Sequence, residues 1–402
     1  MGATRTPGYP DPVTTPNDPA TSPAQALTLG VMGGSRKENE LRLAIHPAHF
    51  ARIPEDLQGR IFLEHGYGVR FGYSDDQLRP LVGGFRSHAQ LVAECDVILQ
   101  PKPLLPDIAE LRDGQVLWGW PHCVQDARLT QLAIDRRLTL IAFEAMNHWH
   151  PDGTFSLHVF HQNNEIAGYS SVLHALQLAG TTGHYGPPLR AVVLGFGSTA
   201  RGAVTALGAL GVLDVDVVTH RQPTAVAAPI HDARLLHLDS SGDSVAAITP
   251  DGPVLLAEFL AEHDVIVNCV LQDTDAPLMF LTDADLPRLR PGTLVVDVSC
   301  DEAMGFSWAR PTSFEQPTFV VGDDVLYYAV DHSPSYLWNA ATWENSEALL
   351  PFLPTVLGGP DAWDAVPTVR RAIEIRDGVI QNPAILTFQA RDPRSPHRPL
   401  AS

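Results

Sequence analysis

The sequence predicts an α/β protein of two domains, each with a mostly parallel sheet, and two long helices that link the domains around a central cleft. Three observations lead to this fold class. The chain has 402 residues, 45% of them hydrophobic, and is therefore too long for one ordinary domain. Apolar, strand-like runs alternate with helical stretches, as in parallel sheets. Helical stretches that begin near Asn164 and after Pro334 flank the second series of strands, which suggests that the first domain resumes near residue 333.

The first domain is expected to comprise residues 28–163 and 333–390 and to bind the substrate. Its strands are predicted in the apolar runs LTLGVMGG, RIFLEHGYGVRFGY, CDVILQP, GQVLWGWPH and LTLIAFEAM, with a helical stretch in DARLTQLAIDRR. Residues 1–27, rich in proline, threonine and aspartate, and residues 391–402 are predicted to be disordered tails.

The second domain is expected to span residues 164–332 and to begin with the linker helix NEIAGYSSVLHALQLAG. The small residues Ala167 and Gly168 allow this helix to pack closely on a neighbour, and Gly180 ends it. The strands that follow are predicted in AVVLGFG, VDVVTHR, HDVIVNCV and GTLVVDVS.

A glycine-rich turn in this second domain predicts a dinucleotide site. Gly195, Gly197 and Ala200 form the pattern G-x-G-x-x-A between an apolar strand and a helix. The glycines permit a tight turn and the close approach of a pyrophosphate, which the helix N-terminus, here with Ser198 and Thr199, binds through its amides and its dipole. The domain is therefore expected to be Rossmann-like, and the alternating strands of the first domain predict a second Rossmann-like unit.

The residues after the next strand favour NADP(H) over NAD(H). An NAD site usually carries an acidic residue here to hold the ribose 2′-hydroxyl, whereas this chain has Thr219, His220 and Arg221. Arg221 can pair with a 2′-phosphate, assisted by His220 or Thr219. The alternative is an NAD site that lacks its acid and lies next to a solvated arginine.

Four polar residues stand at strand ends, where an α/β sheet presents groups to a ligand: Arg42, Lys102, His122 and Asp301. Asp301 belongs to the second domain and is expected to face the others across the cleft. An arginine can bind a carboxylate, a lysine can polarise a carbonyl, and a histidine with a pKa near neutrality can exchange a proton. Together they predict a reductase of 2-oxo acids, whereas each alone could equally be a solvated or loop-capping residue.

The composition excludes several other classes of protein. The chain has 27 basic and 46 acidic residues, so nucleic acid and anionic membrane surfaces would repel it. It has no signal peptide, no apolar run near the ~20 residues of a membrane helix and no C-x-x-C spacing, which together predict a cytoplasmic protein. The histidines of NHWHPDGTFSLHVFH fit no standard zinc pattern, so no metal is expected.

Four motifs in order resemble the group formed by alanine dehydrogenase, saccharopine dehydrogenase (lysine-forming) and carboxyethylornithine synthase. KENELRLAIHP is similar to the N-terminal signature of the group, with Arg42 at its carboxylate-binding arginine. VILQPKP resembles the strand that ends in the substrate-binding lysine, here Lys102, and LRDGQVLWGWPH resembles the segment with the acid/base histidine, here His122. GTLVVDVSCDEAMGF resembles the segment whose aspartate, here Asp301, lies beside substrate and nicotinamide. The resemblance covers about residues 28–355.

Within this group, NNEIAGYSSVLHALQ and HSPSYLWN look closest to carboxyethylornithine synthase, which joins an amine to pyruvate with NADPH. However, His332 in AVDHSPS stands where alanine dehydrogenases and that synthase carry asparagine, and in this respect the chain is more similar to saccharopine dehydrogenase. A different substrate is therefore expected, with His332 among the residues that bind it.

The resemblance implies an NAD(P)-dependent oxidoreductase acting on CH–NH or CH–NH2 groups. With NADPH it would condense an amine or amino acid with a pyruvate-like 2-oxo acid and reduce the imine to a secondary amine. Lys102, His122 and Asp301 are the expected catalytic residues, and Arg42 and His332 the expected substrate-binding residues. The alternatives are an alanine-type amino acid dehydrogenase that uses ammonia and, from another class, a nonenzymatic NADP(H)-binding sensor. The group forms oligomers, so a homo-oligomer is expected.

Overall fold

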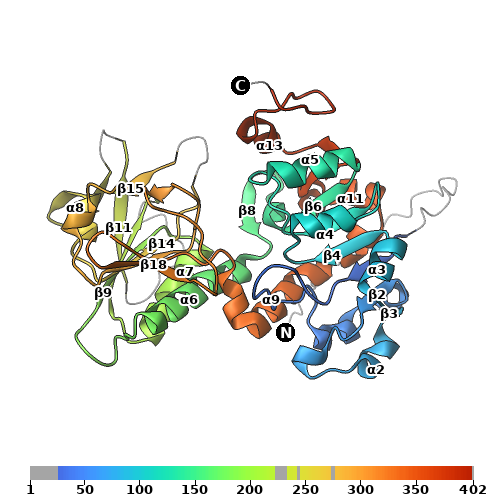
Figure 1. Cartoon of the computed structure of the whole chain (residues 1–402), viewed down its shortest axis with the longest axis horizontal. Helices are drawn as coiled ribbons and strands as arrows, with labels where there is room; N and C mark the ends of the chain where they lie inside the picture. Colours follow the sequence, from blue (N-terminus) through green and yellow to red (C-terminus); the bar gives the residue numbers. More distant parts are fainter. Residues whose placement is uncertain (1–25, 222–232, 242–244, 273–276, 401–402) are drawn as a thin grey trace, which may run out of the picture.

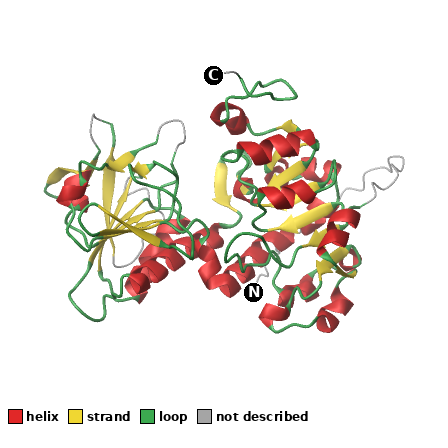
Figure 2. Ribbon diagram, viewed as in Figure 1, coloured by secondary structure: helices red, strands yellow, loops and turns green. Residues whose placement is uncertain are grey.

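A computed structural model describes residues 26–221, 233–241, 245–272 and 277–400. They form two α/β bodies, and the helices α6 (His161–Leu178) and α9 (Trp338–Leu349) lie at the junction between them (Figure 1). Each body contains one large, mostly parallel sheet with helices packed around it (Figure 2). The predicted fold class is thus confirmed. Residues 1–25 and 401–402 of the predicted tails lie outside the described residues.

The first sheet draws its eight strands from both ends of the chain. Six parallel strands are wound so that β1 lies between β2 and β4, and the chain changes its direction of travel across the sheet at this point. A hairpin from the C-terminal part of the chain pairs antiparallel with β6 and extends the sheet. In spatial order the strands are β21 (Val379–Ile380), β20 (Ile373–Arg376), β6 (Thr139–Ala142), β5 (Val116–Gly119), β4 (Val97–Gln100), β1 (Leu29–Val31), β2 (Ile61–Glu64) and β3 (Gly84–Arg86).

The second sheet has nine strands and repeats the same winding, with β9 between β10 and β14. Its two edges are antiparallel. In spatial order the strands are β13 (Gly252–Leu255), β12 (Ala246–Thr249), β11 (Ala233–Asp239), β10 (Asp214–Thr219), β9 (Arg190–Leu194), β14 (Val265–Asn268), β16 (Leu294–Asp297), β19 (Val325–Tyr328) and β18 (Thr318–Val321). Ligands bind such sheets outside the carboxyl ends of the central strands, at the point where the winding changes direction.

The central strands of both sheets are apolar at nearly every position because helices cover both faces of a parallel sheet. All four residues of β4, β5, β6, β14 and β16 are buried. The other helices of the first body are α1 (Glu55–Gln58), α2 (Asp75–Leu78), α3 (His88–Glu94), α4 (Leu105–Glu110), α5 (Ala127–Asp135), α10 (Leu353–Leu357), α11 (Pro360–Ala365), α12 (Pro367–Arg370) and α13 (Pro383–Phe388), and those of the second are α7 (Ser198–Ala209) and α8 (Leu256–Leu260). Two small sheets pair β7 (Asn147–Trp149) with β8 (Phe155–His158) and β15 (Met279–Leu281) with β17 (Gly305–Phe306).

Two glycines let α6 and α7 touch backbone to backbone. A Cβ atom on Gly168 would stand 1.9 Å from the carbonyl oxygen of Thr199, and one on Gly202 would stand 1.8 Å from that of Glu165. Neither position can therefore carry a side chain unless the helices move apart. This contact fixes α7, which begins at the glycine-rich turn, against the helix that leads out of the first body.

The segment 391–400 differs from the expectation of a disordered tail. Arg391 is buried and donates to the side-chain oxygen of Gln131 at 2.7 Å and to the carbonyl of Ala127 at 3.0 Å. The backbone N–H of Ile380 donates to Nε2 of His397 at 3.1 Å. The proline and arginine content that predicted disorder gave no sign of these contacts, which attach the segment to α5 and to the β20–β21 hairpin.

In the described ranges no helix is long and apolar enough to cross a membrane.

Candidate active site and nucleotide-binding loop

Lys102 and His122 lie together at the carboxyl ends of the neighbouring parallel strands β4 and β5. Nζ of Lys102 is 2.9 Å from Nε2 of His122. An ammonium group can only donate, so Nε2 accepts, and in a neutral imidazole the hydrogen is then on Nδ1. Two of the four residues predicted at strand ends thus form one contact, whereas Arg42 lies in the loop after β1 and not at a strand end.

The charge state of this pair differs from the expectation of a histidine that titrates near neutrality. Burial, reinforced by the positive charge of Lys102, lowers the pKa of His122 well below its usual value. Burial also lowers the pKa of Lys102. The His122 side chain nevertheless keeps 41% of its surface exposed. The imidazole is therefore neutral and accessible in the ligand-free protein.

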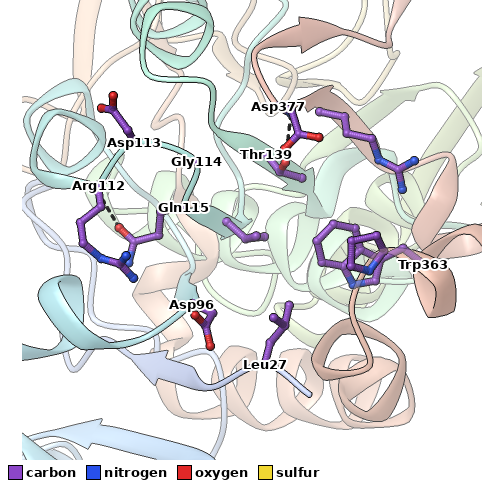
Figure 3. A pocket seen from close by; sticks show the side chains of 12 residues that line it. Leu27, Asp96, Arg112, Asp113, Gly114, Gln115, Thr139, Trp363 and Asp377 are labelled. Carbon is purple, nitrogen blue, oxygen red and sulfur yellow. Dashed lines mark hydrogen bonds between the residues drawn. The ribbon is translucent and has the colours of Figure 1, made fainter. Parts of the chain in front are cut away.

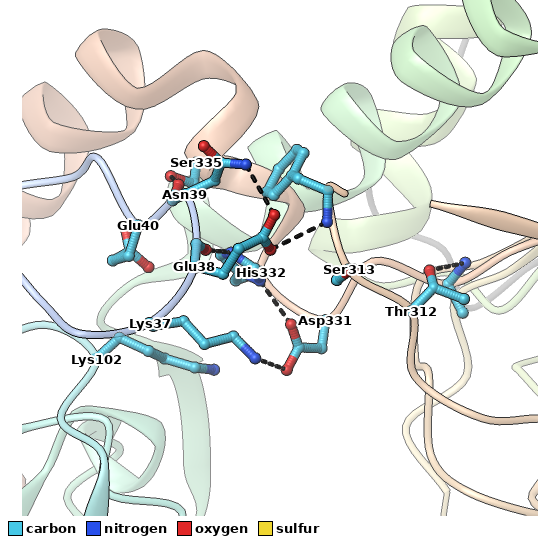
Figure 4. A network of polar contacts seen from close by, with 12 residues as sticks. Lys37, Glu38, Asn39, Glu40, Lys102, Thr312, Ser313, Asp331, His332 and Ser335 are labelled. Carbon is cyan, nitrogen blue, oxygen red and sulfur yellow. Dashed lines mark hydrogen bonds and ion pairs between the residues drawn. The ribbon is translucent and has the colours of Figure 1, made fainter. Parts of the chain in front are cut away.

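Asp331, from the second body, supplies the negative charge that faces this pair. Its carboxylate accepts from Nζ of Lys37 at 2.7 Å, and Figure 4 shows both residues next to Lys102. The charge of Asp331 raises the pKa values of Lys102 and His122 and so opposes the effect of burial. Burial acts against the ionised form of Asp331, but hydrogen bonding to His332 and the charges of Lys102 and Lys37 outweigh it and keep the pKa of Asp331 far below its usual value. Sequence reasoning missed Lys37 and Asp331, although Lys37 belongs to KENE and Asp331 directly precedes His332.

His332 does not face a ligand, which corrects its expected role in substrate binding. Its side chain is completely buried. Nδ1 lies 2.6 Å from a carboxylate oxygen of Asp331, and Nε2 lies 2.6 Å from the carbonyl oxygen of Glu38 (Figure 4). Both ring nitrogens thus lie within hydrogen-bond distance of protein oxygens, so neither is available to a substrate. His332 instead orients Asp331 and holds the loop 37–40.

Arg42 is buried and already makes several hydrogen bonds. Nε donates to Oε1 of Glu40 at 2.8 Å, Nη2 pairs with Oε2 of the same carboxylate, and Nη1 donates to the side-chain oxygen of Asn163 at 3.1 Å. The guanidinium also lies over the ring of Trp120, 5.2 Å from its centre. A guanidinium has five N–H groups, so only the remaining ones can serve a substrate carboxylate.

Asp301 follows β16 in the second body, and burial raises the pKa of its carboxyl group. The thiol of the neighbouring Cys300 is influenced by charges from both bodies. Burial, and after it the charges of Asp297, Asp331 and Asp301, raise the pKa of the Cys300 thiol, whereas the charge of Lys102 lowers it. The thiol therefore lies within electrostatic range of Asp301 and Lys102 alike.

The buried carboxyl group of Asp297 holds the turn that carries Asp301. It accepts from the hydroxyl of Tyr327 at 2.6 Å, from Nδ2 of Asn268 at 2.9 Å and from the backbone N–H of Cys300 at 3.1 Å. These bonds hold the loop after β16 against β14 and β19 and so fix the position of the backbone that leads to Asp301.

The glycine-rich turn has the backbone geometry that a dinucleotide requires. Gly195 follows β9 with φ of 99°, in the left-handed region, and a Cβ there would stand 3.0 Å from the carbonyl oxygen of Cys269. Around Gly197, by contrast, the described residues other than its chain neighbours place no atom within 4 Å of the position of a Cβ, so they leave the turn open to an approaching group. α7 then begins at Ser198, and the amides of its first turn, including those of Thr199 and Ala200, have no acceptor within the helix. These residues fit a pyrophosphate.

Of the three residues predicted to select the nucleotide at the end of β10 and just after it, one is buried and two are exposed. Thr219 is buried, and its hydroxyl accepts from the backbone N–H of Arg221 at 3.2 Å, so it shapes the turn and does not face a ligand. His220 and Arg221 are exposed, and Nη1 of Arg221 lies 3.4 Å from the carbonyl oxygen of Phe196, within the glycine-rich turn. The guanidinium of Arg201 lies over the ring of Phe196 at 4.6 Å, so two arginines flank this turn. Sequence reasoning did not single out Arg201.

Two of the cavities formed by the described residues lie at opposite edges of the first sheet, away from the Lys102–His122 contact. One, of about 350 Å³, lies at the amino ends of β4, β5 and β6, the opposite edge of the first sheet from Lys102 (Figure 3). Its polar groups are bonded within the protein: Arg112 donates to the carbonyls of Val92 and Cys95, and Asp96 accepts from Thr28. The other, of about 390 Å³, lies outside the carboxyl ends of β1, β2 and β4 and is bounded by the loop 33–36. Its Arg36 is paired with Asp107 and Glu110.

The histidines of the β7–β8 region do not converge. The ring of His148 lies tilted against that of Phe352, His150 is exposed, and Nε2 of His158 lies 3.1 Å from the carbonyl oxygen of Phe143. Among the described residues, no group of three or more His, Cys, Asp or Glu side chains is placed to hold a metal ion.

Models of one protein family match most of the chain. The N-terminal domain of the alanine dehydrogenase/PNT family matches residues 31–167, and its C-terminal domain matches residues 176–383. The chain is 25% identical over 372 residues to an alanine dehydrogenase of Mycobacterium tuberculosis, covering 87% of this chain and 94% of the relative. It is 24% identical over 323 residues to an N(5)-(carboxyethyl)ornithine synthase of Clostridium botulinum, covering 77% and 89%.

Solved structures share the fold. An L-alanine dehydrogenase superimposes with a TM-score of 0.71 at 21% identity, covering 90% of this chain and 99% of that one. A transhydrogenase from Sinorhizobium meliloti superimposes with a TM-score of 0.66 at 19% identity, covering 89% and 99%.

Proposed function

The chain belongs to the alanine dehydrogenase/PNT family, and from this premise we propose that it is an NADPH-dependent reductase that condenses an amine or amino acid with a pyruvate-like 2-oxo acid and reduces the imine to a secondary amine. It is an oxidoreductase of CH–NH2 or CH–NH groups that uses a pyridine nucleotide. The proposal concerns which nucleotide and which substrates it takes.

The contact between Lys102 and His122 carries the proposal. Lys102 and the remaining N–H groups of Arg42 would bind the carbonyl and the carboxylate of the 2-oxo acid. The negative charge of that acid raises the pKa of the neighbouring His122, so the imidazole becomes able to hold a proton when substrate is bound. An anionic substrate thus favours the protonated form of His122, whose imidazole is neutral in the ligand-free protein.

The reaction consumes one proton, and we assign its delivery to His122. The amine, the 2-oxo acid, NADPH and one proton give the secondary amine, NADP⁺ and water. The carbonyl oxygen leaves as water when the C=N bond forms, and His122 would donate the proton to that oxygen. Asp301 would position the amine or the departing water on the side of the second domain.

NADPH supplies the hydride when it is bound. Gly195, Gly197 and the first turn of α7 would hold its pyrophosphate, for which their backbone geometry is suited. The guanidinium of Arg221, with His220 beside it, would pair with the 2′-phosphate, and residues 219–221 contain no acidic side chain to hold a free 2′-hydroxyl.

Ammonia in place of the amine is the second candidate, because the relatives include alanine dehydrogenases as well as the synthase. A nonenzymatic NADP(H) sensor is not favoured, since a sensor needs neither a proton donor nor an accessible lysine beside it.

The test measures NADPH oxidation by the purified chain with pyruvate or 2-oxoglutarate. One series receives ammonia and the other a pool of amino acids and diamines, and products are identified by mass spectrometry. Turnover with an organic amine, with a product mass equal to condensation plus two hydrogens, supports the proposal. Turnover with ammonia alone replaces it with an amino acid dehydrogenase, and nucleotide binding without any turnover favours the sensor.

A further inference from the structure

Asn163 is a buried polar residue that the proposed reaction does not use. It lies in the first turn of the 18-residue helix α6 and is only 7% exposed. Its side-chain oxygen accepts from Nη1 of Arg42 at 3.1 Å. A guanidinium can only donate, so this bond fixes which end of the amide faces Arg42. The other end, Nδ2, therefore points away from the atom that holds it.

The two N–H groups on Nδ2 of Asn163 are unused. Among the described residues, no acceptor lies within hydrogen-bond distance of them. Buried donors are nearly always paired in folded proteins, because an unpaired donor loses its bonds to water without compensation. An unpaired donor on so deeply buried a side chain thus indicates a place for an acceptor that the described part of the chain does not supply.

The neighbouring Arg42 has N–H groups to offer but little net charge. Glu40 accepts from Nε and from one N–H of Nη2, and Asn163 accepts from one N–H of Nη1. One N–H on each of Nη1 and Nη2 remains. The side chain of Glu40 is completely buried against the guanidinium, so the two charges compensate each other. An anion that binds at Arg42 therefore gains from further donors, and Nδ2 belongs to the amide group that contacts this guanidinium.

The N-terminal end of α6 favours an anion at the same place. The helix begins at His161, its N-cap residue Phe160 makes no side-chain bond to the free amides, and the first turn contains no acidic residue. The partial positive charge of the helix end is thus uncompensated within that turn. The ring of Trp120 lies 5.2 Å from that of Phe160, and the guanidinium of Arg42 lies 5.2 Å from the centre of the Trp120 ring. Because Trp120 stands just before the segment of His122, this helix end lies beside the candidate site.

We propose that Asn163 binds the carboxylate of the 2-oxo acid through Nδ2, together with the two remaining N–H groups of Arg42 and the N-terminal end of α6. This inference rests on the proposed function, because it names the substrate group that binds here. The amide exchanges no proton, so its loss should weaken the binding of the 2-oxo acid more than it slows turnover.

Asn163→Asp tests this contact, because the carboxylate keeps an acceptor for Arg42 and nearly the same shape but removes the N–H groups and adds a negative charge. The KM for pyruvate or 2-oxoglutarate should rise about 10- to 100-fold, as expected for the loss of a hydrogen bond to a charged group. The value of kcat should change less, and the KM for NADPH should not change.

Gln162→Glu is the matched control, since it makes the same change from amide to carboxylate in the same helical turn, at an exposed position. Solvent and salt screen a charge there, so the KM for the 2-oxo acid should stay within about threefold of the wild-type value. Three results overturn the inference: an unchanged KM in Asn163→Asp, an equal rise in both variants, or a rise in the KM for the amine in place of that for the 2-oxo acid.

The binding of oxamate, an unreactive isostere of pyruvate, makes a second test that does not depend on turnover. Calorimetric titration of the full-length protein with NADPH present should give a dissociation constant about 10- to 100-fold higher for Asn163→Asp than for the wild type. If chemical denaturation shows that this variant is unfolded, Asn163→Leu replaces it, since leucine also removes the donor and adds no charge. A wild type that binds no oxamate, or an unchanged dissociation constant in the folded variant, overturns the inference. If oxamate binding depends on Asn163 but no amine and 2-oxo acid turn over, the proposed function has failed and the carboxylate site stands.

Discussion

Lys37 and Asp331 form an ion pair of 2.7 Å between residues 294 positions apart in the chain, one in each body. This pair closes the polar network that His332, Glu38 and Ser335 continue across the junction (Figure 4). It also places a carboxylate opposite Lys102 and His122, whose pKa values that carboxylate raises. The junction between the bodies therefore contributes a negative charge that opposes the effect of burial on Lys102 and His122.

Removal of this carboxylate charge should shift the pH dependence of the reaction. In Asp331→Asn the pKa values of Lys102 and His122 fall, because the charge that raises them is gone. The limb of kcat/KM that falls with rising pH should then move down by about one pH unit. Asp323→Asn, in an exposed turn, serves as the control. An unchanged profile would show that Asp331 does not act on the ionisation of the site.

Replacement of the candidate proton donor should affect chemistry and not nucleotide binding. His122→Ala is expected to lower kcat by about 100- to 10,000-fold, the range typical of general acids. The NADPH dissociation constant, measured by fluorescence titration, should stay unchanged because the glycine-rich turn lies in the other body. Loss of turnover and of NADPH binding together would contradict the assigned role.

The exposed arginine after β10 should select the nucleotide. Arg221→Ser removes the proposed partner of the 2′-phosphate, and a hydrogen bond to a charged group contributes about 1.5–3 kcal/mol. The KM for NADPH should rise about 10- to 100-fold, while the KM for NADH changes little. Equal effects on the two nucleotides would place the 2′-phosphate elsewhere or show that NADH is the natural reductant.

The contact between α6 and α7 should tolerate no side chain. Gly202→Ala forces a Cβ against the carbonyl of Glu165 and should lower the free energy of unfolding by about 1–3 kcal/mol or more. Gly208→Ala is a matched control on the same helix, since Gly208 is exposed and, beyond its own helix, the part of the chain that the structure describes places no atom within 4 Å of its Cβ position. It should be neutral or stabilise by up to about 1 kcal/mol. Chemical denaturation compares the two, and equal stabilities would refute the backbone contact.

The fold class could be predicted from the sequence because its signals are local. Apolar runs such as those of β4, β5, β9 and β14 are continuous in the chain, and the turn at Gly195 combines a strand, a tight turn and a helix within a few residues. The order of C-terminal residues 391–400 could not be predicted in this way, because Arg391 is held by partners on α5 that are distant in the sequence.

In the candidate site, too, the sequence predicts the residues whose signal is local and misses those that depend on contacts between distant segments. Lys102 and His122 stand at strand ends, so their meeting follows from the parallel order of β4 and β5. Lys37 and Asp331 act through a contact between distant segments, for which no spacing in the chain gives a signal. His332 is predicted to bind substrate because alanine dehydrogenases and carboxyethylornithine synthase carry asparagine at its position. A difference in sequence, however, does not tell whether a side chain faces the ligand or, as His332 does, holds a neighbouring residue.

The strand β20 has a consequence for the order in which the molecule can form during synthesis. The ribosome completes β6 early but makes the strand that covers its edge only when nearly the whole chain has emerged. Until then the growing chain presents an unpaired strand edge, the kind of surface on which nascent chains aggregate. The second body is contiguous in sequence and can fold first, so a premature stop before Ile373 should release a protein in which that body is complete while the other lacks the edge of its sheet.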